Sequence, residues 1–294
     1  MWLFKSFYDM TENQLKDENP WKYVADMIDP REKDCLFRDK AKKWYVCEKD
    51  EERILVFNRK CKENDTDLII TNTPPEPWRG NPLTANLIIL TLNPGYDPNI
   101  NESLAKLIQC VDEVREELVK FRKQTLKLES QSMMPENDNN SPISCFEAED
   151  MISGWYWTKN LKTLREKSEL DEKEFYKRVA VIEFHGYSST TCRRRFPLYR
   201  KDSSYLESQE FNKKLIDYIV NNRRDDVRFL IVRAKRQWVK FLGDLYDKKI
   251  FLSRGNKGRN PSISKDNLAK KNKDGIIEND IFNRVLDAVT RQLK

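Results

Sequence analysis

The sequence predicts an α/β protein, a three-layer α/β/α domain with a central four-stranded parallel sheet. Two observations predict this fold. Four short apolar runs rich in β-branched residues recur along the chain, near 86–92, 178–184, 227–232 and 249–252. Longer segments with helical periodicity separate the runs. Fully apolar strands that alternate with helices are typical of a parallel sheet covered by helices on both faces.

The helical segments complete this pattern in chain order. A long amphipathic helix is expected after the first strand, one helix before the second strand, one on each side of the third strand, and one at the end of the chain. These segments are 102–127, 161–176, 211–220, 235–245 and 277–293. The polar segment 130–144 is expected to be a mobile loop between two of the helices.

The first 77 residues have a different character, rich in charged and aromatic side chains. We expect residues 1–77 to form an N-terminal elaboration packed on the core, and residues 78–294 to form the α/β domain. Within the first region, residues 44–47 and 54–57 are expected to pair as a hairpin across a charged turn. The segment 74–82 contains four prolines in nine residues and should lack regular structure, because proline fixes φ and has no N–H donor.

Charge and cysteine usage limit the classes of function. The net charge of the chain is +6, but residues 221–294 contain 19 Lys and Arg against 9 Asp and Glu. A basic C-terminal quarter suits a polyanionic partner, and a solvated charged surface is the alternative.

The six cysteines lack any C-x-x-C spacing, which argues against a zinc ribbon. No run approaches the roughly 18 apolar residues of a membrane span. We expect a cytoplasmic monomer that uses no metal and no cofactor.

A sharp turn follows the first strand. The strand ends in Thr91-Leu92, and Asn93, Pro94, Gly95 and Tyr96 come next. Ligands of α/β proteins bind beyond the carboxyl ends of parallel strands, where this turn is placed. Asn-Pro-Gly is also ordinary turn chemistry, so a simple strand-ending turn is the alternative.

A second polar turn follows the last strand, about 170 residues later. It reads Asn260-Pro261-Ser262-Ile263-Ser264, and Gly255 and Gly258 precede it. Cations flank it on both sides. A flexible basic loop without a specific ligand is the alternative interpretation.

Together the two turns resemble the motifs of the uracil-DNA glycosylase superfamily, in particular its mismatch-specific and single-strand-selective branches. Those branches carry a first motif Gly-x-Asn-Pro-Gly and a second motif Asn/His-Pro-Ser; here the first motif lacks its leading Gly. The resemblance covers residues 78–294 and implies hydrolysis of the N-glycosidic bond of a flipped base in DNA. It implies that Asn93 and Asn260 are the catalytic residues, with Asn93 holding the attacking water, and that Pro94, Gly95 and Tyr96 contact the base.

The second loop is expected to bind DNA. Cations and hydroxyl groups there would hold phosphates, and Ile263 would act as an apolar wedge in the base stack. The predicted DNA-binding residues are Arg254, Lys257, Arg259, Ser262, Ile263, Ser264 and Lys265.

The end of the second strand supplies further candidates for substrate binding, namely Glu183, Phe184 and His185, the last being the only histidine of the chain. The family offers an Asn there that reads uracil. Glu183 would repel the O4 atom of uracil but would accept a hydrogen bond from an exocyclic amine such as that of cytosine. A Glu held in a salt bridge is the alternative. Trp78, just before the first strand, is expected to wall the pocket, or else to anchor the core.

Three functions therefore stay open. The first is a glycosylase acting on single- or double-stranded DNA. The second is a protein with the glycosylase fold that binds nucleic acid without cleaving it, an interpretation that Glu183 favours. The third is an enzyme acting on a small nucleotide, whose single phosphate the basic loop would bind.

Overall fold

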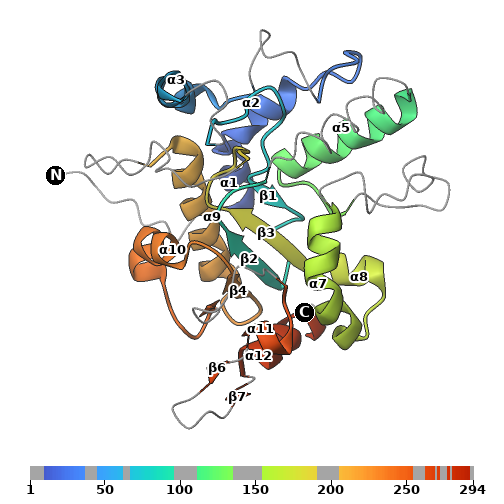
Figure 1. Ribbon diagram of the computed structural model, residues 1–294, viewed down its shortest axis with the longest axis vertical. Helices are drawn as coiled ribbons and strands as arrows, with labels where there is room; N and C mark the ends of the chain where they lie inside the picture. The colour runs from blue at the N-terminus through green and yellow to red at the C-terminus, as the bar shows by residue number, and fades with distance from the viewer. Residues whose placement is uncertain are drawn as a thin grey trace.

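The computed structural model describes residues 10–36, 45–61, 67–95, 111–134, 154–190, 205–253, 262–268, 270–271, 277–278 and 280–291. Within these residues, the main sheet has five strands in the order β1-β3-β2-β4-β5 (Figure 1). The four predicted strands all form, as β2 (Leu87–Thr91), β3 (Val179–Glu183), β4 (Arg228–Ile231) and β5 (Phe251–Ser253). They pair in parallel, with β2 between β3 and β4, and β5 beside β4.

The fifth strand makes the sheet mixed rather than purely parallel. β1 (Trp78–Arg79) pairs antiparallel with β3 at the edge of the sheet. It lies inside the proline-rich segment that was expected to lack regular structure, so that expectation is wrong for these two residues. An edge strand tolerates neighbouring prolines because it needs donors on one side only.

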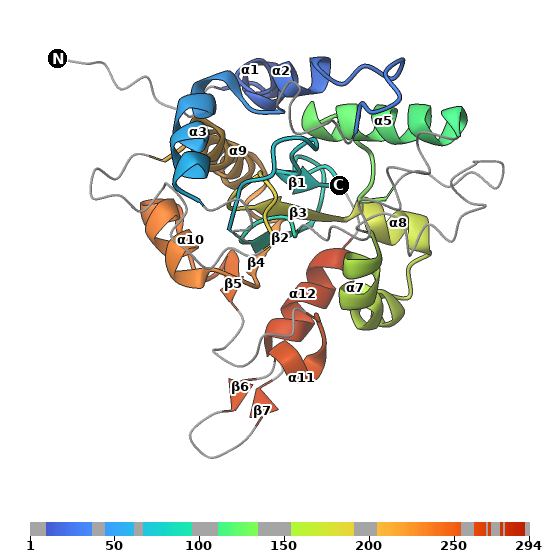
Figure 2. The same cartoon turned by 45° about the horizontal axis from the view of Figure 1, so that its top comes forward.

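Helices cover both faces of the sheet, as predicted (Figure 2). Alternate side chains of β2, such as Ile88 and Leu90, join a core cluster with one set of helices, while Leu87 and Ile89 join a second cluster on the other face. The first set consists of α1 (Glu12–Asp17), α2 (Trp21–Asp26), α3 (Glu51–Lys60), α5 (Asp112–Leu126), α9 (Glu207–Arg223) and α10 (Lys235–Leu242). The second set consists of α7 (Gly154–Ser168), α8 (Glu172–Lys177), α11 (Lys265–Leu268) and α12 (Asp280–Thr290).

Short elements complete the fold. Glu48–Asp50 and Gly243–Leu245 are 3₁₀ turns at the start of α3 and the end of α10. β6 (Lys270–Lys271) and β7 (Ile277–Glu278) form a separate antiparallel pair. The predicted helix over 161–176 is two helices, because Glu169 adopts a left-handed φ of 56° between α7 and α8. The predicted helix over 102–127 is described from Asp112 onward, and most of the predicted loop 130–144 lies outside the described residues.

The N-terminal region shares the first core cluster with the sheet. Trp21 of α2 is fully buried and meets Trp78 of β1 edge to face, with ring centroids 6.5 Å apart. A Cβ atom on Gly186 would lie 2.5 Å from the Trp21 ring, so the close approach of this ring to the backbone at residue 186 requires glycine. The two regions on either side of the predicted boundary at residue 77 therefore pack on one another without a gap.

The predicted hairpin in this region is wrong, because residues 51–60 form helix α3. Glu51 and Glu52 lie in its first turn and Arg59 and Lys60 in its last, an arrangement that the helix dipole favours. The side chain of Asn58 also exchanges two hydrogen bonds with the backbone of Ile69, at 2.9 and 3.0 Å. The apolar run Ile54-Leu55-Val56-Phe57 therefore lies in a helix that its end charges and the Asn58 contacts favour.

Candidate functional site

The candidate site lies at the carboxyl edge of the sheet. Because β2, β3, β4 and β5 are parallel, the segments that follow them all leave the sheet at this edge. Thr91 and Glu183, the last residues of β2 and β3, are direct partners in the strand register. Among the described residues, the edge therefore collects Asn93 after β2, His185 after β3 and Arg233 after β4.

Asn93 is held by its amide nitrogen. The Nδ2 atom donates to the carbonyl oxygen of Pro94 and to the hydroxyl of Ser189, each at 3.0 Å. Gly95 forms a parallel bridge with Ser189, which ties the turn to the loop after β3. Within the described residues, the Oδ1 atom of the half-buried Asn93 accepts no hydrogen bond. The amide is thus fixed in orientation and presents one acceptor.

Glu183 is a buried carboxyl group, with 7% of its surface exposed. Its Oε2 atom accepts a hydrogen bond from the hydroxyl of Thr91. Burial raises the pKa of Glu183 to about 7, and the charge of Glu76 adds to this, while Thr91, Arg233 and Arg79 oppose it. At neutral pH this side chain is therefore close to its titration midpoint, between a hydrogen-bond donor and an anion.

Glu76 is the second carboxylate of the neighbourhood and behaves in the opposite way. It forms ion pairs with Arg79, at 2.6 Å, and with Arg122. Burial alone would raise the pKa of Glu76, but the guanidinium groups of Arg122 and Arg79 hold it at about 2. Of the two carboxylates, Glu76 is permanently ionised and only Glu183 can exchange a proton near neutrality.

Three of the predicted substrate-binding residues are core residues. Phe184 is 2% exposed and packs edge to face on Trp238, with centroids 5.0 Å apart. His185 is 1% exposed, its Nδ1 atom lies 3.0 Å from Nε2 of Gln209, and burial lowers its pKa to about 3, so the ring is neutral. Trp78 is 1% exposed and donates its indole N–H to the carbonyl of Thr125. These burials correct the expectation that Phe184, His185 and Trp78 contact the substrate.

The described part of the second motif is Ser262, Ile263, Ser264 and Lys265. Ile263 is fully buried in the second core cluster, and its backbone N–H donates to the carbonyl of Asn160 at 2.8 Å. The wedge role expected for Ile263 is therefore wrong, since inserting it into DNA would empty a core position. Ser264 directly precedes helix α11, and its hydroxyl accepts from the backbone N–H of Asn267 at 3.4 Å. Lys265 is exposed.

Several predicted residues lie outside the described part of the chain. They are Tyr96, Arg254, Lys257, Arg259 and Asn260. The central strand β2 and the edge strand β5 run in the same direction, and the convergence of Asn93 with Asn260 stays a prediction.

Two features of the edge were missed by the sequence analysis. Trp238 of α10 donates its indole N–H to the carbonyl of Thr91 at 2.7 Å, which fixes this helix to the end of β2. Arg233 lies over the ring of Tyr156 of α7, 6.0 Å from the centroid. The sequence feature that could have indicated them is the run Arg233-Ala234-Lys235-Arg236 directly after a strand. The charge was counted only over residues 221–294 as a whole, so this run did not stand out.

The described residues contain no group of three or more His, Cys, Asp and Glu side chains that could hold a metal ion. Among the helices of the same residues, none is both long and apolar enough to cross a membrane.

Comparison of the chain with protein-family models, with curated proteins and with solved structures found no match in any of the three.

Proposed function

We propose that the chain is a DNA glycosylase-like protein that hydrolyses the N-glycosidic bond of a flipped base, with a water molecule positioned by Asn93. The observation that carries the proposal is the geometry of the Asn93 amide. Both of its N–H groups have protein acceptors, so its Oδ1 atom is the one left to accept a hydrogen bond from a ligand. A water that donates one hydrogen to this oxygen has its lone pairs directed away from it, toward a sugar carbon.

The chemistry fits an amide. Cleavage of an N-glycosidic bond passes through a sugar with oxocarbenium character, and the nucleophile needs orientation more than deprotonation until the bond to the base is nearly broken. Asn93 supplies orientation and cannot take the proton. Hydrolysis leaves the hydroxyl of the water on the sugar and its remaining proton on the departing base. Among the described residues of this edge, Glu183, with a pKa of about 7, is the carboxyl group that can carry this proton.

Glu183 also supports a choice of base. Its ionised form accepts a hydrogen bond from an exocyclic amine, as on cytosine or a modified cytosine, and repels the carbonyl O4 of uracil. Its protonated form donates instead and would tolerate a carbonyl. We therefore infer a preference for amine-bearing bases above pH 7, with the preference declining below it.

The test is an excision assay on oligonucleotides that carry uracil, hypoxanthine or modified cytosines, with alkaline cleavage of the resulting abasic sites. The wild-type protein should excise at least one of these bases. Asn93→Ala should reduce the rate at least about 100-fold, because a positioned group acting in the transition state is lost. Asn93→Asp should retain or increase excision, since a carboxylate can also hold water and take its proton. Excision unchanged in Asn93→Ala would contradict the proposal.

The burial of Glu183 favours a second candidate, a protein that binds nucleic acid without cleaving it. With 7% of the residue exposed and Oε2 already bonded to Thr91, little of the carboxyl group is open to a base. In that case neither wild type nor Asn93→Asp would release any base, while binding of DNA would persist in both.

A further inference from the structure

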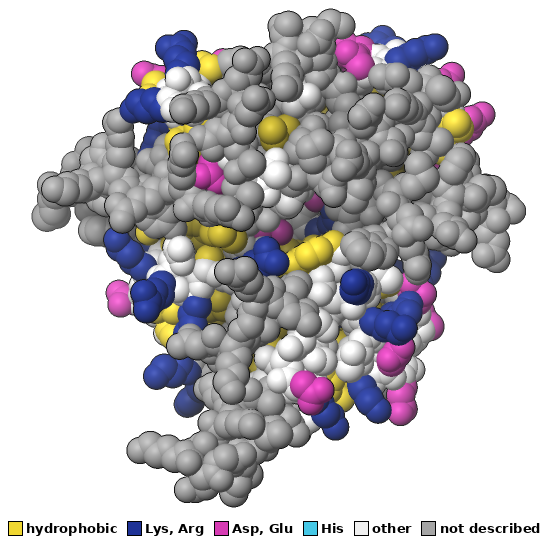
Figure 3. Space-filling model, viewed as in Figure 1, with side chains coloured by type: hydrophobic (Ala, Val, Ile, Leu, Met, Phe, Trp, Pro, Cys, Tyr) yellow, Lys and Arg dark blue, Asp and Glu magenta, His cyan; other side chains and the backbone are white. Residues whose placement is uncertain are grey.

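Helix α10 and the residues just before it carry an exposed row of cations. The α10 strip consists of Arg233, Lys235, Arg236 and Lys240, all of which are exposed. Within the described residues, none of the four forms an ion pair. Figure 3 shows Lys and Arg side chains gathered over α10, at the left of the view.

The cations at the start of the α10 strip do not stabilise helix α10. Its sequence KRQWVKFL contains three cations and no acidic residue. Lys235 and Arg236 stand in the first turn, where the helix dipole is positive and cations are unfavourable. Ala234, which precedes the helix, has a left-handed φ of 55° and caps it with no side-chain hydrogen bond. A bound anion would relieve the repulsion at this end.

The α10 strip also adjoins the candidate site. Trp238, on the inner side of the same helix, is bonded to Thr91, the register partner of Glu183. Arg233, at the start of the strip, lies over the half-buried Tyr156, an aromatic surface beside a cation. Such pairs of a cation and an aromatic ring recur where proteins hold single nucleic-acid strands.

An anionic membrane is a poor fit for this helix. A helix that lies on a membrane inserts an apolar face between the lipids. The three largest apolar residues of α10 are already packed in the core, because Trp238, Phe241 and Leu242 are 0%, 2% and 1% exposed. The remaining face is cationic and suits a hydrophilic polyanion.

We propose that the α10 strip binds the sugar–phosphate backbone of the nucleic-acid strand whose base enters the site. The helix rises about 12 Å over its eight residues, which matches about three phosphates along one strand of a duplex. The proposal rests on the proposed function for the presence of a strand at this edge. It places on α10 the phosphate contacts that the sequence predicts for the loop after β5.

The test compares Lys235→Gln/Arg236→Gln with the control Lys120→Gln/Lys173→Gln. Lys120 of α5 and Lys173 of α8 are also exposed, and both helices lie away from α10 in Figures 1 and 2. The dissociation constant for an unmodified 20-nucleotide DNA, single-stranded and duplex, is measured by fluorescence anisotropy between 50 and 300 mM NaCl. Each neutralised phosphate contributes about 0.7 to 0.9 to the slope of log affinity against log salt.

The strip variant should bind about tenfold more weakly and with a slope smaller by about 1.4 to 1.8, while the control keeps the wild-type slope. Equal slopes in the two variants would overturn the proposal. Unmodified DNA makes the readout independent of excision, so failure of the proposed catalysis leaves it intact. If the double variant does not fold, Lys240→Ala at the exposed far end of the strip replaces it, with an expected slope change of about one.

Discussion

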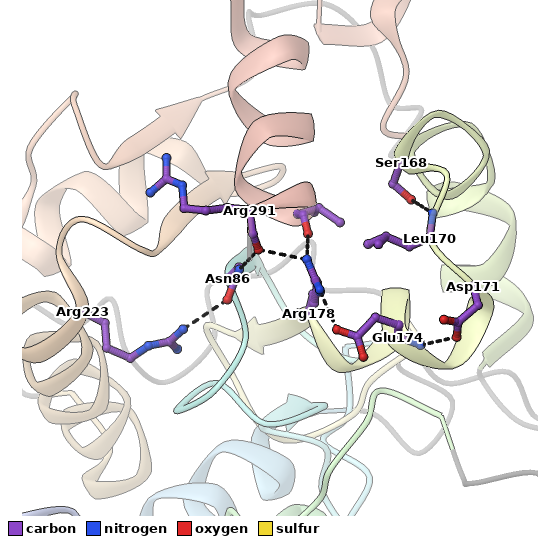
Figure 4. A network of polar contacts seen from close by, with 9 residues as sticks. Asn86, Ser168, Leu170, Asp171, Glu174, Arg178, Arg223 and Arg291 are labelled. Carbon is purple, nitrogen blue, oxygen red and sulfur yellow. Dashed lines mark hydrogen bonds and ion pairs between the residues drawn. The ribbon is translucent and has the colours of Figure 1, made fainter. Parts of the chain in front are cut away.

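The two edges of the sheet use their polar side chains in opposite ways. At the amino edge, Arg178 donates to Glu174 at 2.7 Å and to the carbonyl oxygens of Val289 and Arg291 at 3.1 and 2.9 Å (Figure 4). At the carboxyl edge, Asn93 presents an acceptor that no described residue uses, and the cations of the α10 strip form no ion pair with another described residue.

The amino-edge network explains how the last helix is attached. Asn86 donates to the carbonyl of Arg291 at 3.2 Å, and its Oδ1 atom accepts from Arg223 at 3.3 Å. Together with Arg178, these bonds satisfy carbonyl groups at the end of α12 that have no partner inside the helix. Polar groups that hydrogen-bond to one another stabilise a fold, whereas polar groups without a partner in the protein indicate a binding site. The difference between the edges therefore supports function at the carboxyl edge.

Removing the centre of the amino-edge network should have the largest effect on stability. Arg178→Ala removes the donor to the carbonyl of Val289 and to the carboxylate of Glu174, and it leaves the carbonyl of Arg291 with Asn86 alone. We expect the free energy of unfolding to fall by about 3 kcal/mol, measured by urea denaturation at pH 7. DNA binding by the folded fraction should be unchanged. A loss of DNA affinity larger than the loss of folded protein would remove the distinction between the edges.

Glu183→Gln should stabilise the protein in a pH-dependent way. The pKa of Glu183 in the folded state, about 7, lies above its ordinary value of 4.5, so the folded state binds the proton more tightly. The wild type therefore loses stability as the pH rises from about 4.5 to 7 and carries the full cost of the buried charge above that range. The variant should be more stable than wild type at pH 8, by up to about 3 kcal/mol, and equal to it at pH 4.

Thermal unfolding across this pH range measures the effect. Glu76→Gln is the matched control, because Glu76 has a lowered pKa of about 2 and neutralises Arg79 and Arg122. That variant should be less stable than wild type at pH 8, with the deficit shrinking as the pH falls from 4.5 toward 2. A gain in Glu183→Gln that is the same at pH 4 and pH 8 would disagree with the assigned ionisation.

Ser189→Ala should have the smallest effect. The hydroxyl of Ser189 accepts one of the two hydrogen bonds that orient Asn93. Its loss should cost about 1 kcal/mol or less in stability. We expect excision to slow several-fold through kcat, with the KM for DNA unchanged, because the amide keeps its bond to the Pro94 carbonyl. An effect on KM alone would mean that Ser189 contacts DNA rather than positioning Asn93.

The sequence predicted the parts of the fold that depend on local pattern. The four parallel strands were recognisable because a strand buried on both faces is a short continuous apolar run. The run Ile54-Leu55-Val56-Phe57 has the same composition but forms a helix, since flanking charges and the Asn58 contacts decide the outcome. β1 was hidden because only its partner β3 makes Trp78 and Arg79 extended.

The site was predictable as an edge of the sheet and not as a set of exposed side chains. Parallel strands fix where Asn93 and Glu183 leave the sheet, but sequence position does not tell which side chains other helices cover. Phe184 and Ile263 were predicted to contact ligands, but helices cover them and they are core residues. The sequence did not predict the α10 strip because it does not show where α10 lies. The hydrogen bond from Trp238 to Thr91 places the outer face of this helix beside the candidate site.

The most direct test compares two asparagines at opposite ends of the same strand. Asn86 precedes β2 at the amino edge, and Asn93 follows it at the carboxyl edge. For Asn86→Ala and Asn93→Ala, the single-turnover rate of base excision and the free energy of unfolding are measured on the same preparations. Asn86→Ala should lose about 2 kcal/mol of stability and keep the wild-type rate. Asn93→Ala should lose at least about 100-fold in rate and about 1 kcal/mol or less in stability. Loss of excision in Asn86→Ala with a wild-type rate in Asn93→Ala would contradict the account.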